Sequence, residues 1–250
     1  MMNPAEFANI AAAEKDFWWY RGMRRILFRL LDPCLQNRPL RRALEAGCGT
    51  GYFSWQLQHE RSLNVVPLDL GWEGLQYAHS MGVRNAVQGD LASLPFPAAA
   101  FDLVMSLDVL VHFPRGEEHL AARELTRVLA PGGLLVLRVS ALDMLRSRHS
   151  EFAFERQRFT RRRLMGLVAG CGVHVLRCTY ANSLLLPAAL AKFRLWEPLT
   201  RQAPASGVQP VSPWLDRLLG VPLALESAWI GSGRNFPLGQ SLVLIGEKMG

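Results

Sequence analysis

The segment from Arg42 to Phe53 constrains the fold of this chain more than any other part of its sequence. Residues 42–45 read as a short buried strand that ends in an acidic residue. Three glycines follow at alternate positions, Gly47, Gly49 and Gly51, and an apolar helical pattern begins after them. Glycine adopts a positive φ cheaply, and the free N–H groups of a helix N-terminus attract electron-rich groups. The segment therefore predicts a strand, a tight turn and a helix that together bind a ligand.

The glycine spacing separates two classes of nucleotide-binding turn. A nicotinamide-binding turn more often has the spacing G-x-G-x-x-G, with its third glycine inside the helix. Here the spacing is G-x-G-x-G, and Glu45 stands two residues before the first glycine. This arrangement resembles motif I of the class I S-adenosylmethionine-dependent methyltransferases. The resemblance implies that S-adenosyl-L-methionine is the cofactor and that Glu45, Gly47, Cys48, Gly49 and Gly51 bind it.

Acidic residues at the ends of the next two expected strands extend the resemblance. Residues 63–69 read as an apolar strand ending in Asp69, at the spacing where a carboxylate meets the ribose of an adenosine-containing cofactor. Leu70 follows it in the same expected site. Residues 85–91 read as a third strand with Asp90 near its end. In the family, an aspartate here accepts from the adenine amino group and the next backbone N–H serves a ring nitrogen, which implies these roles for Asp90 and Leu91.

The fourth expected strand, which begins at Phe101, leads to the methyl-transfer region. Residues 94–104 resemble the "LPFxxxxFDxV" run of the methyltransferases. The carboxyl ends of parallel strands face the ligand, so Ser106 is expected to border the cofactor and His112 to line the reacting centre. His112 is a candidate general base, because imidazole accepts a proton near neutral pH. The alternative is that His112 only orients its loop, since a histidine is common here in the family whatever the substrate.

Residues 1–37 are expected to form an N-terminal helical lid. Four adjacent aromatic residues at 17–20 precede a helical pattern over 23–31, with apolar residues on one face and arginines on the other. The aromatic group either packs as a hydrophobic cap or covers the cofactor. In the second case Trp19 contacts the cofactor, and Arg21 or Arg24 lies near its carboxylate. Some bacterial methyltransferases carry a similar Trp-rich, Arg-containing segment before motif I, which favours the lid.

The second half of the chain completes the expected sheet. A helix is predicted over 117–129, a turn at 130–133 and a fifth strand over 134–139. A basic stretch over 141–159 carries His149, the second catalytic candidate, although a solvated linker is the alternative. Thr160 predicts the N-cap of a helix over 161–170, followed by a strand over 173–179. The last strand, expected over 240–246, should run antiparallel.

Residues 182–237 are expected to form an insertion before the last strand, with helical pieces over 184–196 and 214–230. Its apolar residues are flanked by cationic ones. Such an element could pack on the sheet, form an oligomer, or rest on a membrane that carries a lipid-linked substrate. The sequence leaves these three roles open.

Composition limits the class of protein and its partners. The chain has 250 residues, half of them hydrophobic, which suits one large α/β domain. Its net charge of +7 suits nucleic acid, an anionic membrane or an anionic substrate as a partner. The alternative is that the excess of arginine reflects only the composition of the genome. The four cysteines lack C-x-x-C spacing, and no signal-peptide pattern or apolar run of about 18 residues occurs. We expect a cytoplasmic protein with reduced thiols and no metal.

Together these patterns predict a Rossmann-like, doubly wound α/β fold with a seven-stranded, mostly parallel sheet. The expected divisions are a lid (1–37), a cofactor-binding core (38–181), the insertion (182–237) and the last strand (238–250). The expected function is methyl transfer to oxygen, nitrogen or carbon of a small molecule such as a sugar, lipid or secondary metabolite. Nucleic acid is not expected, because no N/D-P-P-Y motif for a flipped base occurs. A non-catalytic scaffold that keeps the cofactor pocket and a nicotinamide-dependent oxidoreductase are the alternatives.

Overall fold

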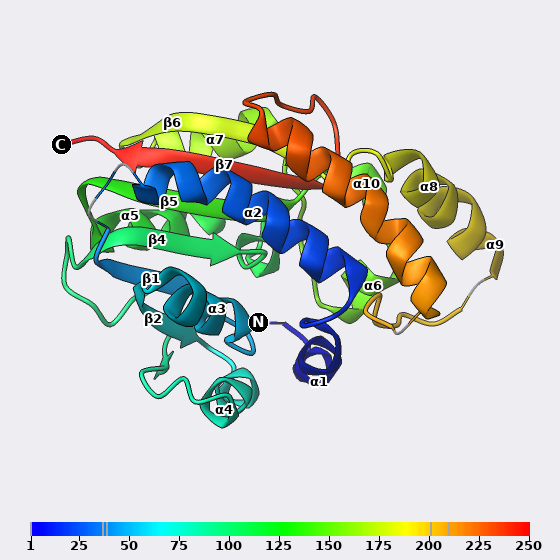
Figure 1. The fold of residues 1–250 in the computed structure, drawn as a ribbon, viewed down its shortest axis with the longest axis horizontal. Coiled ribbons are helices and arrows are strands. Elements are labelled where there is room, and N and C mark those ends of the chain that lie inside the picture. The colour runs from blue at the N-terminus through cyan, green and yellow to red at the C-terminus, as the bar shows by residue number, and fades with distance from the viewer. Residues whose placement is uncertain (1, 37, 39, 201, 210) are drawn as a thin grey trace.

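A mixed β-sheet forms the centre of the computed structural model, which describes residues 2–36, 38, 40–200, 202–209 and 211–250. Within these residues the sheet has seven strands in the order β3-β2-β1-β4-β5-β7-β6 (Figure 1). The strands are β1 (Arg42–Ala46), β2 (Asn64–Asp69), β3 (Val87–Gln88), β4 (Phe101–Leu107), β5 (Leu129–Ser140), β6 (Val173–Ala181) and β7 (Ser241–Lys248). The first five pair in parallel, and β7 runs antiparallel to both β5 and β6. The predicted fold class is confirmed.

Helices cover both faces of the sheet because its central strands are apolar on both sides. One face is covered by α2 (Trp18–Gln36), α3 (Tyr52–Arg61) and α10 (Pro213–Gly231), which bury Ile26, Leu57 and Leu223 in a shared core. The other face is covered by α5 (Glu118–Val128) and α7 (Arg161–Ala169), which bury Leu125 and Leu164. The helix α4 (Trp72–Ser80) packs beside β2 and β3.

The N-terminal segment contains two helices with different surroundings. The short helix α1 (Pro4–Ala13) packs against α4, where Phe7 lies beside Gly71 and Gly74. The longer helix α2 begins at Trp18, five residues before the expected helix, and lies along the sheet beside α10 (Figure 1). A Cβ on Gly22 would lie 2.3 Å from Leu223 Cδ1, so this glycine permits the close approach of α2 and α10.

Two expected elements differ in length from those observed. The third strand was expected over 85–91, but β3 contains only Val87 and Gln88. The chain leaves the sheet edge here because Asp90 folds back: its carbonyl accepts from Ser93 N–H and its carboxylate from Ala92 N–H. The fifth strand starts five residues early, at Leu129, because residue 129 already pairs with Phe101 before a register shift.

The insertion before β7 is helical. It contains α8 (Leu186–Ala191), a π-helical turn η3 (Lys192–Trp196), α9 (Glu197–Thr200) and α10. The buried carboxyl of Glu226 on α10 accepts N–H bonds of 2.7 Å from both Ser183 and Leu184, which fixes the start of the insertion. The remaining short elements are η1 (Leu110–His112), η2 (Asp143–Leu145) and α6 (Arg148–Phe152). In the part of the chain described, no helix combines the length and hydropathy needed to cross a bilayer.

Candidate functional site

A cavity of about 1040 Å³ opens at the carboxyl ends of the parallel strands. The ends of β1, β2 and β4 form its floor, and the walls come from α1, the start of α2, the segment 140–158 and the insertion. Most of the residues expected at the site line this cavity: Trp19, Glu45, Gly47, Cys48, Gly49, Asp69, Leu70, Asp90, Leu91, His112 and His149. Gly51, Ser106 and Arg21 are not among its lining residues.

The glycine loop has the left-handed backbone that its sequence predicts, with φ values of 86° at Gly47, 57° at Gly49 and 79° at Gly51. A Cβ on Gly47 would lie 2.1 Å from Val109 Cγ2, so this position must be small for packing. A Cβ on Gly49 would meet nothing within 4 Å, although Gly49 lines the cavity. Gly49 therefore leaves backbone open to a ligand, while Gly51 caps α3 outside the cavity.

Asp69 joins the glycine loop to the end of β2. Its Oδ2 accepts the N–H of Gly49 and its Oδ1 accepts the N–H of Gly71, both at 2.7 Å. Burial raises the pKa of the Asp69 carboxyl, and these backbone N–H groups oppose that shift. Each carboxylate oxygen retains a second lone pair, so the group can also accept from two vicinal hydroxyls. This is the chemistry that a ribose requires.

Two further carboxyls line the glycine-loop end of the cavity. Glu45, buried at the end of β1, accepts a hydrogen bond from Ser54 Oγ, and burial raises its pKa to about 8. Glu14, which sequence reasoning missed, accepts from Thr50 Oγ1 within the glycine loop, and burial raises its pKa to about 7. A cationic ligand would stabilise the ionised forms of both groups. This end of the cavity therefore suits a ligand that carries an amino or sulfonium charge.

The aromatic and arginine side chains near the start of α2 differ in whether they line the cavity. Trp19 lines the cavity and stacks on the Arg138 guanidinium, 5.2 Å from the ring centroid. Arg21 was expected near the cofactor carboxylate, but its side chain pairs with Asp216 of α10 at 2.7 Å. Arg24 lines the cavity instead and donates to the backbone carbonyl of Glu14. Arg24 therefore lines the cavity, and Arg21 does not.

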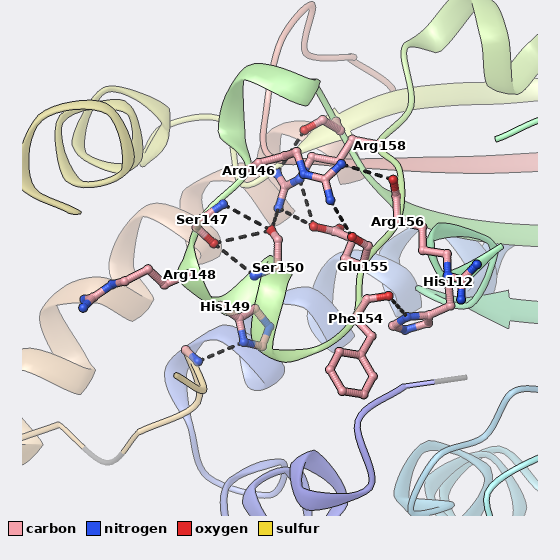
Figure 2. A network of polar contacts seen from close by, with 12 residues as sticks. His112, Arg146, Ser147, Arg148, His149, Ser150, Phe154, Glu155, Arg156 and Arg158 are labelled. Atoms are coloured by element: carbon pink, nitrogen blue, oxygen red, sulfur yellow. Dashed lines mark hydrogen bonds and ion pairs between the residues drawn. The ribbon is translucent and has the colours of Figure 1, made fainter. Parts of the chain in front are cut away.

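The two histidines present different ring nitrogens to the cavity. His112 Nδ1 lies 3.2 Å from the Phe154 carbonyl, which can only accept, so Nδ1 carries the proton and Nε2 has a free lone pair (Figure 2). His149 Nδ1 accepts the N–H of Gly207 at 2.9 Å, so its proton lies on Nε2 (Figure 2). Burial lowers the pKa of both rings, which keeps them neutral at pH 7. His112 can thus accept a proton, whereas His149 can donate a hydrogen bond.

The segment 146–158 forms a network of arginines around one buried carboxylate (Figure 2). Glu155 accepts from Arg158 at 3.0 Å, and Arg158 also donates to Ser150 Oγ at 3.0 Å. Arg146 donates to the Glu155 carbonyl at 2.7 Å. These contacts hold the segment in the cavity wall, and they leave Arg156 out of the network of side chains. The Arg156 N–H donates to Val111 O at 2.8 Å, which places this residue beside His112.

Ser106, also expected at the site, lies in the sheet instead of on the cavity surface. It is 1% exposed within β4, and its Oγ has no hydrogen-bond partner in the described part of the chain. The neighbouring Asp108 does line the cavity, with a left-handed φ of 60° and an ion pair of 2.7 Å to Arg138. Among the described residues, no group of three or more His, Cys, Asp and Glu side chains is arranged to hold a metal ion.

Comparison with known proteins finds a methyltransferase domain over part of the chain. Residues 44–137 match the family model of a methyltransferase domain. The chain is 34% identical over 136 residues to the malonyl-[acyl-carrier protein] O-methyltransferase of Erwinia billingiae, covering 53% of this chain and 52% of that protein. It is 32% identical over 146 residues to the tRNA U34 carboxymethyltransferase of Saccharophagus degradans, covering 54% and 42%. The chain thus spans about half or less of these curated relatives.

A solved structure supports the fold over nearly the whole chain. The crystal structure of an S-adenosylmethionine-dependent methyltransferase from Archaeoglobus fulgidus superposes with a TM-score of 0.59. It covers 94% of this chain and 97% of that one, at 17% identity. At this identity the likeness describes the fold alone, including the part of the chain beyond residues 44–137.

Proposed function

This chain belongs to the class I S-adenosylmethionine-dependent methyltransferases, and on that premise we propose that it methylates a small acceptor that carries a carboxylate or phosphate group. S-adenosylmethionine, when bound, supplies a methyl group on an electrophilic sulfonium centre. The protein contributes chiefly proximity and orientation to such a transfer. The observation that carries the proposal is that two cations lining the cavity, Arg156 and Lys192, form no ion pair in the described part of the chain.

The carboxyl end fits the cofactor. Gly49 exposes backbone to the cavity, and Asp69 has free lone pairs for two ribose hydroxyls. Glu45 and Glu14 gain negative charge when a cation approaches, since burial alone holds their pKa values high. We assign the adenine to the side of Asp90 and Leu91, and the methionine carboxylate to the side of Arg24.

The other end of the cavity suits an anionic acceptor. Arg148, Arg156 and Lys192 all line it. Among the described residues, Arg156 and Lys192 form no ion pair, whereas the Nε of Arg148 lies 4.0 Å from the carboxylate of Glu197. Arg138 and Arg158 are already neutralised by Asp108 and Glu155. Arg156 and Lys192 can therefore bind an acid group, because charge-assisted hydrogen bonds are roughly twice as strong as neutral ones.

His112 has the geometry of a base for a hydroxyl or amine nucleophile. The Phe154 carbonyl holds Nδ1–H, which aims the free Nε2 lone pair away from that contact. A neutral imidazole accepts the proton that such a nucleophile loses as its bond to the methyl carbon forms. His149, with its proton on Nε2, is assigned to orient the acceptor.

The names of two relatives agree with an anionic acceptor, whereas a third relative is named a sterol 24-C-methyltransferase. Malonyl-acyl carrier protein carries a carboxylate, and tRNA is a polyanion. We favour the small acid because Arg156 and Lys192 line a single cavity, whereas the phosphate backbone of tRNA would require a broad strip of cations. Transfer to tRNA is the second candidate, and it is one outcome of the test.

The test measures cofactor binding and methyl transfer separately. S-adenosylhomocysteine is titrated calorimetrically into wild type, Asp69→Asn, Arg156→Gln and the control Arg123→Gln, an exposed arginine outside the cavity. Transfer of labelled methyl groups is then followed to a panel of small acids, their uncharged esters, and tRNA. Arg156→Gln should leave S-adenosylhomocysteine binding unchanged and raise the KM for the acid by roughly 10- to 100-fold, the value of one charge-assisted hydrogen bond.

Three outcomes would overturn the proposal. Equal transfer to acids and their esters would remove the role of the cations, and transfer to tRNA alone would select the second candidate. A folded wild type that binds neither S-adenosylmethionine nor S-adenosylhomocysteine would indicate a scaffold. Control variant Arg123→Gln must match wild type in each assay.

A further inference from the structure

Helix α10 exposes a continuous apolar stripe to solvent. The stripe consists of Trp214, Leu218, Val221, Leu225 and Trp229, each between 44% and 66% exposed. At 100° per residue, these five positions fall within about 80° of the helix circumference. They occupy a single face from the first turn of the helix to the last.

The opposite face of α10 is the face that packs, and it carries apolar residues beside the buried Glu226 and Ser227. Leu223 and Ile230 are fully buried in the core that α10 shares with α2 and the sheet. A helix on the surface of a soluble protein normally has one apolar face and one polar face. The inner face is already packed against the protein. An exposed apolar stripe on the outer face is therefore typical of a surface that binds a membrane or another protein.

The acidic residues of the insertion are buried or paired with other groups. Between residues 182 and 240 the sequence has three acids, Glu197, Asp216 and Glu226. Glu226 is fully buried against backbone N–H groups, and Glu197 is buried and accepts the N–H of Arg148. Asp216 pairs with Arg21 and also accepts the N–H of Trp18. None of these three presents a free negative charge outward.

The cations of the insertion remain outside. Arg194, Arg217 and Arg234 are all exposed, and Lys192 is exposed at the cavity rim. Arg234 stacks on Trp229 at the end of the stripe, 4.5 Å from the ring centroid. The exposed charge around the stripe is thus positive, which complements an anionic surface.

We propose that the α10 stripe lies in the headgroup region of an anionic membrane, parallel to its surface. Its 16 residues span about 24 Å, and tryptophan stands at both ends, where its amphipathic ring suits the interface between lipid and water. An amphipathic face of this kind binds through buried apolar area and through attraction of its cations to anionic lipid. The helix does not span the bilayer, since its inner face is packed on the protein.

A second copy of the chain fits this surface less well. A two-fold contact along the stripe would bring Arg217 and Arg234 of one copy against arginines of the other, and like charges at an interface cost several kcal/mol. The stripe also adjoins the cationic end of the cavity. Leu219 of α10 and Lys192 of η3 both line that cavity, so binding to a membrane would place the cavity close to the lipid surface.

Vesicle co-sedimentation tests the proposal on the full chain. The vesicles are phosphatidylcholine alone, or phosphatidylcholine with phosphatidylglycerol, each at low and high salt. The stripe variant is Trp214→Ser/Leu218→Ser/Leu225→Ser, and the charge variant is Arg194→Gln/Arg217→Gln. The matched control is Trp72→Ser, which removes a tryptophan that is 58% exposed on α4. Urea unfolding and S-adenosylhomocysteine titration verify that each variant is folded.

We expect wild type and Trp72→Ser to bind the anionic vesicles equally, with weaker binding at high salt. The stripe variant should bind at least about tenfold more weakly. The charge variant should lose about fivefold for each arginine on anionic vesicles only. Absence of binding by wild type, or an equal loss in Trp72→Ser, would overturn the proposal. A stripe variant that alters the oligomeric state by light scattering and leaves vesicle binding unchanged would assign the stripe to self-association instead.

Discussion

Gly47 and Gly49 have similar backbone conformations but different surroundings, so one substitution should have different consequences at the two positions. Both have positive φ, 86° and 57°. A Cβ on Gly47 would lie 2.1 Å from Val109 Cγ2, whereas a Cβ on Gly49 would project into open space beside the cavity. Gly47→Ala should therefore mainly destabilise the fold, and Gly49→Ala should mainly impair cofactor binding.

The magnitudes follow from two separate costs. A left-handed backbone costs alanine about 1–2 kcal/mol at either position. Overpacking adds about 1–3 kcal/mol at Gly47, because Val109 is β-branched and its side chain cannot turn away. The free energy of unfolding should therefore fall by about 2–5 kcal/mol in Gly47→Ala and by about 1–2 kcal/mol in Gly49→Ala.

Gly172 supplies the matched control. It has a φ of 76°, a Cβ there would meet nothing within 4 Å, and it is not among the residues that line the cavity. Gly172→Ala should lose the same unfolding free energy as Gly49→Ala. Only Gly49→Ala should bind S-adenosylhomocysteine more than about tenfold more weakly, since its new methyl group occupies space beside the backbone that the cofactor contacts.

Urea unfolding and calorimetric titration measure the two effects. The double variant Gly47→Ala/Val109→Ala should recover the part of the unfolding free energy that overpacking removes, since the new Cβ collides with the Val109 side chain. Wild-type affinity in Gly49→Ala would refute the assignment of this loop as the cofactor cradle. A Gly47→Ala variant no less stable than Gly172→Ala would refute the packing argument.

Three further predictions concern Glu45, His112 and Glu226. Burial raises the pKa of the Glu45 carboxyl from 4.5 to about 8, so the folded chain binds this proton more tightly than the unfolded chain. The stability that the bound proton contributes is therefore lost as the pH rises from 4.5 to about 8. Glu45→Gln should flatten that loss in urea unfolding at pH 5 to 8.5, and an unchanged pH slope would contradict the assignment. His112→Gln should lower kcat by about 10²–10⁴ for a hydroxyl acceptor and leave S-adenosylhomocysteine binding intact; an unaltered rate would restrict His112 to orienting its loop. Glu226→Gln keeps an oxygen for the N–H groups of Ser183 and Leu184, whereas Glu226→Leu should cost about 1–3 kcal/mol for each N–H left unpaired; equal stability of the two variants would argue against this anchor.

The position of the glycine loop and of Asp69 at the cavity could be predicted because local structure places these residues. A strand followed by a glycine turn aims the loop at the end of the sheet, and Asp69 follows the next strand in the same way. Gly47 directly follows the end of β1, Gly49 stands three positions beyond that end, and Asp69 is the last residue of β2. Their places are therefore fixed by the strands alone, without knowledge of distant contacts.

Local structure does not predict which of Arg21 and Arg24 faces the cavity. Both lie on α2, and successive residues of a helix are separated by about 100°, so a small rotation of the helix decides which side chain faces the cavity. That rotation is set by the burial of Met23, Ile26 and Leu27 against the sheet and by Asp216, nearly 200 residues away, which pairs with Arg21. The apolar face of α2 can be read from the sequence, but the pairing of Arg21 with Asp216 has no local signal.

Glu14 was missed for a related reason. It follows α1 in a stretch without a motif, and it reaches the site only because α1 packs on α4 and brings its carboxyl to Thr50. The length of β3 was also beyond a local pattern, because an edge strand ends where its own turn competes with the ladder, as Asp90 does here.

In the insertion, the sequence shows an apolar pattern, but which face of α10 is buried depends on packing against the rest of the chain. The spacing of Trp214, Leu218, Val221, Leu225 and Trp229 can be read directly, yet the opposite face of the same helix also carries apolar residues, beside Glu226 and Ser227. The core buries the face that carries Leu223, and Gly22 of α2 leaves room for that side chain. Once this contact is made, the tryptophans must face outward. A membrane surface is then the covering that agrees with both the exposed stripe and the cations around it.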